Sequence, residues 1–144
     1  MLGLEDAMRK KIALAALGYS LITFVHGFTW HLVFFKDVYE SFGVYTRKTP
    51  IIPMGFASMV LQGIVLAMLY ASQARDQLSN PYIAAIRFNL LMGLFFASGT
   101  VLALAAKAEI AHLGAWFGYN LAFATIQFLL SGLVFGYVFG RKES

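Results

Sequence analysis

The stretch that decides the fold is IALAALGYSLITFVHGFTWHLVFF, residues 12–35, which has 24 consecutive positions without a charged side chain. A helix needs about 20 apolar residues to cross the roughly 30 Å hydrocarbon core of a bilayer. The stretch is longer than the apolar region of a signal peptide, about 7 to 15 residues, and no small-residue cleavage site follows it. We therefore expect a retained membrane-spanning helix over residues 12–35.

Three further apolar runs follow the first, and each is long enough to cross a membrane. They cover residues 51–72, 81–106 and 110–139. The composition agrees, because 60% of the 144 residues are hydrophobic and only 12% are charged, against about 25% charged in soluble domains. The sequence predicts an all-α fold, an integral membrane antiparallel four-helix bundle that forms a single domain over residues 1–144.

The orientation of these helices is predicted from their flanking Lys and Arg residues, which are more frequent on the cytoplasmic side. With both termini inside, the cytoplasmic side holds seven of them: Arg9, Lys10, Lys11, Arg75, Arg87, Arg141 and Lys142. The other side holds four: Lys36, Arg47, Lys48 and Lys107. We expect a protein of a bacterial inner membrane with cytoplasmic termini. Its net charge of +4 fits contact with anionic lipids, and no nucleic-acid partner is expected.

Three histidines gather on the outer side under this topology. His26 and His31 fall in the outer part of the first helix, and His112 falls in the first turn of the fourth. At 100° per residue, His26 and His31 are about 140° apart around an α-helix. We expect His26 to face the fourth helix at a depth comparable to that of Trp116, Tyr119 and Asn120, whereas His31 faces lipid headgroups or a partner.

The histidines have two interpretations. In the first they belong to an aromatic belt at the membrane boundary. In the second they bind haem, copper or a quinone, and the candidate binding residues are His26, Trp30, His31, His112 and Trp116. The chain has no cysteine, so thiolate ligands are excluded. The sequence contains no catalytic motif such as HExxH, a nucleophile elbow or a glycine-rich phosphate loop.

Small residues and buried amides indicate how the helices pack. Small residues at four-residue spacing let helix backbones approach closely in a membrane, and amides bond to a neighbouring helix. The predicted packing residues are Gln62, Gly63, Ala67, Gly93, Gly114, Gly118, Gln127, Gly132 and Gly136. The two glycine rows of the fourth helix are offset by about 80°. One row can therefore serve the bundle and the other a partner.

The segment YESFGVYTRKTPIIPMGFASMVLQGIVLAMLY, residues 39–70, combines a Tyr- and Gly-containing loop with a Pro-rich entry to the second helix. Following a His- and Trp-bearing first span, this layout resembles small bacterial four-helix integral membrane proteins of unknown function. The resemblance implies no activity. We expect a non-catalytic accessory or assembly subunit, or a homo-oligomer, that packs with lipids or other apolar ligands. The alternatives are the cofactor protein described above and, third, a lipid-modifying enzyme.

Overall fold

The structure is a computed structural model that describes residues 2–44, 47, 49–73 and 80–141. Its long helices are α1 (Leu2–Phe28), α3 (Ile52–Gln73), α4 (Pro81–Ala97) and α6 (Leu113–Gly140). Two π-helical segments, η1 (Thr29–Phe34) and η3 (Ser98–Leu102), extend α1 and α4. Within the described residues, four helical stretches are long and apolar enough to cross a membrane. The chain is therefore an all-α integral membrane protein with a four-helix bundle.

The observed helices differ from the predicted bounds in three places. The first helix begins at Leu2 rather than near residue 12, because hydropathy marks the membrane-spanning part of a helix and not its solvated start. The predicted loop after residue 35 begins with a short helix, α2 (Lys36–Ser41). The third span is not one α-helix to residue 106, since α4 gives way to η3 and then to α5 (Ala103–Ala105).

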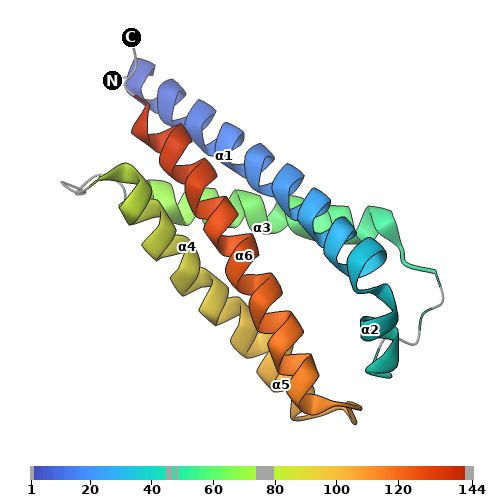
Figure 1. Ribbon diagram of the computed structural model, residues 1–144. Coiled ribbons are helices and arrows are strands. Elements are labelled where there is room, and N and C mark those ends of the chain that lie inside the picture. The colour runs from blue at the N-terminus through green and yellow to red at the C-terminus, as the bar shows by residue number, and fades with distance from the viewer. Residues whose placement is uncertain (1, 45–46, 48, 74–79, 142–144) are drawn as a thin grey trace.

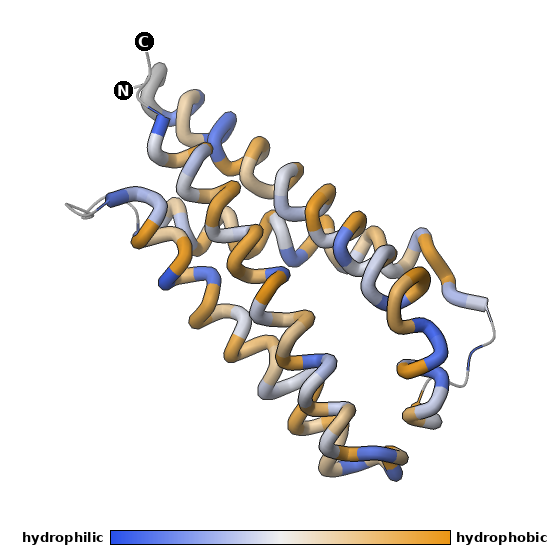
Figure 2. Tube along the Cα trace, in the orientation of Figure 1, coloured by the Kyte–Doolittle hydropathy of each residue, from blue (hydrophilic) through white to orange (hydrophobic). Residues whose placement is uncertain are grey.

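Helix α6 lies between α1 and α4, and α3 packs on another side of α1. Figure 1 shows both termini at one end of the bundle, which we call the termini end. The opposite end holds α2 and the start of α6, and we call it the α2 end. Along the helices, hydrophobic positions predominate, and hydrophilic ones occur at the ends and at single points between them (Figure 2). These views fit helices whose middle parts lie in lipid.

Glycines bring α6 and α4 into backbone contact. A Cβ added at Gly132 would stand 2.7 Å from the Cα of Ile86, and one added at Gly136 would stand 2.8 Å from the Cα of Tyr82. Helix α3 approaches α1 in the same way, because a Cβ on Gly63 would lie 2.8 Å from the carbonyl oxygen of Ala16. Only glycine permits these separations, so the glycines determine which helices can be neighbours.

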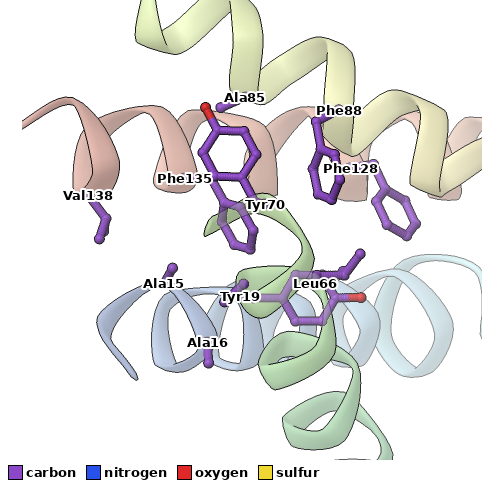
Figure 3. Close-up of a cluster of buried hydrophobic side chains, with 11 residues drawn as sticks. Ala15, Ala16, Tyr19, Leu66, Tyr70, Ala85, Phe88, Phe128, Phe135 and Val138 are labelled. Atoms are coloured by element: carbon purple, nitrogen blue, oxygen red, sulfur yellow. The ribbon is translucent and has the colours of Figure 1, made fainter. Parts of the chain in front are cut away.

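The main apolar cluster lies nearer the termini end and joins all four long helices (Figure 3). Tyr70 of α3 is at its centre, with its ring 5.2 Å from that of Phe88 on α4 and 5.7 Å from that of Phe135 on α6. The first residues of α3 have no such packing. Ile52, Met54 and Phe56 are 51%, 67% and 41% exposed. Helix α3 is thus anchored at its end and open to lipid at its beginning.

The close approach of α6 and α4 predicts a difference between two glycines of one helix. Gly132→Ala should destabilise the folded bundle by roughly 1–3 kcal/mol, because its methyl group meets the Ile86 backbone. Gly118→Ala is the matched control, since nothing lies within 4 Å of a Cβ at Gly118, and it should be neutral or slightly stabilising. Unfolding of both variants in the same detergent measures the effect. Equal stabilities would contradict the proposed packing role of Gly132.

Candidate functional site

A buried glutamine on α6 organises the polar interior of the bundle. Gln127 is 2% exposed, and its Nε2 donates to the hydroxyls of Thr23 and, at 3.3 Å, Ser131. Its Oε1 lies 3.1 Å from Nδ1 of His26. Both amide hydrogens are used by the hydroxyls, so Oε1 accepts a hydrogen bond from a protonated Nδ1. In a neutral His26 ring this arrangement places the proton on Nδ1 and leaves Nε2 unprotonated.

The second nitrogen of His26 is unpaired within the part of the chain that the structure describes. Nε2 is buried and makes no hydrogen bond to any described residue. The imidazole lies parallel to Phe123 of α6, with ring centroids 4.7 Å apart and an interplanar angle of 8°. The ring of Trp30 meets it edge-on at 5.6 Å. The surroundings therefore offer aromatic surface on several sides of a free hydrogen-bond acceptor.

The predicted separation of His26 from His31 is wrong. The His31 ring also contacts Phe123, at 4.6 Å, and it contacts Tyr39 at 4.3 Å, so it does not point away to headgroups. The reason is the π-helical segment η1, in which the Phe35 N–H donates to the Trp30 carbonyl five residues back, at 3.0 Å. A π-helix has more residues per turn than an α-helix, and residues five apart come to the same side.

Helix α2 encloses this side of the site. The backbone leaves the helical conformation at Phe35, with φ −123° and ψ 23°, and α2 then places Tyr39 over His31. The Tyr39 hydroxyl accepts a hydrogen bond from Nε1 of Trp30 at 3.1 Å, and Tyr39 is only 4% exposed. Trp30 and His31 are thus held by a segment that the sequence analysis treated as loop.

Two of the predicted binding residues lie elsewhere. Trp116 is 1% exposed and packs against Phe42 at 5.5 Å, and its Nε1 lies 3.4 Å from the Val101 carbonyl of η3. His26 lies deeper than the predicted level of Trp116, Tyr119 and Asn120. It faces Phe123 and Gln127 further along α6, because the start of α6 packs against Phe42, which follows α2. His112 is exposed and precedes α6 as its N-cap, in the left-handed conformation with φ 58°. It is not in the first helical turn.

The predicted packing residues divide into two groups. Gln127 bonds to α1 as described above, and Gln62 of α3 accepts a hydrogen bond from the Tyr19 hydroxyl at 2.9 Å. Ala67 is fully buried, and a Cβ on Gly93 would lie 2.8 Å from the Phe128 ring. By contrast, nothing lies within 4 Å of a Cβ on Gly114 or Gly118. These two glycines make no packing contact in the described chain.

Sequence reasoning missed Thr23, Ser131, Tyr39 and the role of Phe123. A signal existed for the two hydroxyls, because Thr23 precedes His26 by three positions and Ser131 follows Gln127 by four, which places each on its neighbour's helix face. Phe123 could have been found by the same spacing, four positions before Gln127. Tyr39 had no such signal, because its place depends on the break at Phe35.

The chain matches no protein-family model, no curated protein and no solved structure. Among the described residues, no group of three or more His, Asp or Glu side chains is placed to hold a metal ion. The site consists of an imidazole oriented by Gln127, with aromatic rings around it and an Nε2 that has no hydrogen-bond partner among the described residues.

The hydrogen bond between His26 and Gln127 predicts different effects for two equivalent substitutions. His26→Phe keeps a ring against Phe123 but leaves the buried Oε1 of Gln127 without its donor, which should cost about 1–3 kcal/mol of stability. His31→Phe should change stability by less than about 0.5 kcal/mol, because no hydrogen bond between described residues involves His31. Thermal unfolding of both variants in one detergent checks this. A loss that is equal in both would contradict a specific role for His26.

Proposed function

We propose that this protein is a non-catalytic component of a bacterial inner membrane. It acts as an accessory or assembly subunit that packs against another membrane protein or a second copy of itself, surrounded by bound lipids. The observation that carries the proposal is the row formed by Gly114, Gly118 and Ala122 on α6. All three residues are exposed, and apart from the neighbouring backbone of α6 itself no described atom lies within 4 Å of a Cβ added at either glycine.

The two glycine rows of α6 support this proposal by their contrast. The row at Gly132 and Gly136 brings α4 into backbone contact, whereas the row at Gly114 and Gly118 offers the same shape with no helix on it. Large side chains flank this second row, with Leu113 47% and Leu121 46% exposed. In a membrane, association comes from close packing rather than from hydrophobicity, and small-residue rows are where it occurs. A helix of a partner fills such a row more closely than flexible lipid tails do.

The position of the basic residues supports a cytoplasmic location for the termini end. Lys11 donates from Nζ to the Arg141 carbonyl at 2.9 Å, so the two basic ends of the chain lie together. Arg9 and Lys10 are exposed beside them. This cationic group matches the side on which Lys and Arg accumulate in membrane proteins and anionic headgroups are found.

The proposed partner surface predicts site-dependent crosslinking. Because the chain has no cysteine, Ala122→Cys can carry a single photoreactive benzophenone on the row. Leu91→Cys, at an α4 position that is 61% exposed, is the matched control facing lipid. We expect light to give a protein adduct of defined mass from position 122 but not from position 91. Adding Gly118→Leu should abolish this adduct, because the leucine fills the row. Adducts with lipid alone at both positions would overturn the proposal.

The proposed topology predicts the behaviour of reporter fusions. A reporter active only in the cytoplasm should be active when fused after Ser144 and inactive within residues 40–48, and a reporter active only outside should show the reverse. The asymmetry of seven against four basic residues is the physical reason. Cytoplasmic activity at residues 40–48 would show the opposite orientation, and it would place the His26 site in the inner leaflet.

A further inference from the structure

We propose that His26 is the hydrogen-bonding residue of a binding site for a planar apolar molecule with a hydroxyl group, of the quinol or phenol class. The hydroxyl donates to Nε2 of His26, and the ring of the ligand lies among Phe123, Trp30 and His31. This site is formed between α1 and α6, so it lies on a different face of α6 from the glycine row at Gly118. The inference does not depend on the proposed partner.

The acceptor character of Nε2 follows from the bonds of its neighbours. Gln127 has no free amide hydrogen, because Thr23 and Ser131 take both. Its Oε1 therefore requires the proton of His26 on Nδ1. In the neutral ring Nε2 then presents a lone pair, and it has no partner among the described residues. Buried polar atoms are rarely left unpaired unless a ligand, water or function accounts for them. A donor hydroxyl completes the set.

The planar, apolar character of the ligand follows from the walls. His26 is stacked on Phe123 at 4.7 Å, Trp30 stands edge-on to it at 5.6 Å, and His31 contacts the same Phe123 ring at 4.6 Å. The indole N–H of Trp30 is already bonded to Tyr39, so it is not the group that recognises a ligand. Aromatic walls favour stacked or edge-on contact with another ring. Among described residues, the absence of a three-ligand group makes an organic donor the better match than a metal ion.

A route to the site from the lipid runs along the beginning of α3. Met59 of α3 reaches Gly27, where its Cε lies 3.7 Å from the position of an added Cβ, and Cζ of Phe123 lies 4.0 Å from the same position. The preceding residues of α3 are exposed, including Met54 at 67%. A methionine side chain is flexible and fills irregular space. The proposed route requires rotation of Met59 and a small movement of the start of α3, where the Phe56 ring contacts Phe24 of α1 at 5.7 Å. The Gln127 hydrogen bonds are not part of this movement.

The decisive experiment is ¹⁵N NMR of the histidine-labelled protein in lipid nanodiscs, because the chain has only three histidines. The variants His112→Asn and His31→Phe assign the remaining resonances to His26. We expect His26 to be protonated on Nδ1 and unprotonated on Nε2. Decylubiquinol, which has donor hydroxyls, should move the Nε2 resonance toward its hydrogen-bonded position. Decylubiquinone, which has only acceptor oxygens, should leave that resonance unchanged.

Affinity measurements on variants give a second test. His26→Phe should weaken decylubiquinol binding about tenfold, the equivalent of one hydrogen bond, and leave decylubiquinone binding unchanged. His112→Asn changes an exposed residue that precedes α6, and it should alter the affinity for neither probe. The proposal is overturned by a proton on Nε2, by equal responses to quinol and quinone, or by an Nε2 resonance that neither probe moves. The spectra need no substitution of His26, so the test holds even where His26→Phe fails to fold.

Discussion

The hydrogen-bonded side chain of Gln127 is the constraint on which the rotation of α1 against α6, and with it the environment of the two histidines, depends. A bilayer gives apolar helices no hydrophobic reason to prefer one rotation over another, so polar contacts and close backbone packing decide it. Gln127 uses its oxygen and both amide hydrogens, and it bonds to Thr23 and His26 on α1 and to Ser131 on its own helix. These bonds fix the rotation of α1 against α6. A glutamine turned to any other direction would leave a buried amide without partners.

The environment of His26 and His31 is a consequence of that fixed rotation. Once His26 is held on Gln127, an ideal α-helix would carry His31 about 140° away, but η1 replaces the last turns of α1 with a π-helix. His31 then reaches Phe123, and the break at Phe35 allows Tyr39 to close over it. A second π-helical segment, η3, supplies the carbonyl near Trp116. Irregular helix geometry is therefore concentrated at the α2 end, where π-helical turns frequently accompany function.

The four spans could be predicted from sequence, because uninterrupted hydrophobic length is a direct requirement of the bilayer. The π-helical turn could not, since TWHLVF contains neither proline nor glycine to mark an irregularity, and it arises from packing against α2 and α6. The depth of His26 was also inaccessible, because it depends on the packing of the start of α6 against Phe42, which follows α2. Glycine spacing indicated which residues form rows, but only the structure distinguishes the occupied row at Gly132 from the unoccupied row at Gly118.

The bundle is consequently rigid on one side and adaptable on the other. The contact of α6 with α4 involves backbone atoms at Gly132 and Gly136, and backbones that touch cannot shift without breaking the fit. Helix α3 contacts α1 closely at Gly63 and reaches α4 and α6 through Tyr70, but its first turns have exposed side chains on all sides. Local motion is cheapest where few contacts are lost. The His26 enclosure lies between these regions. Its hydrogen bonds are to the rigid α6, and Met59 borders it from the adaptable α3. A site that orients a ligand and admits it from the lipid needs both properties.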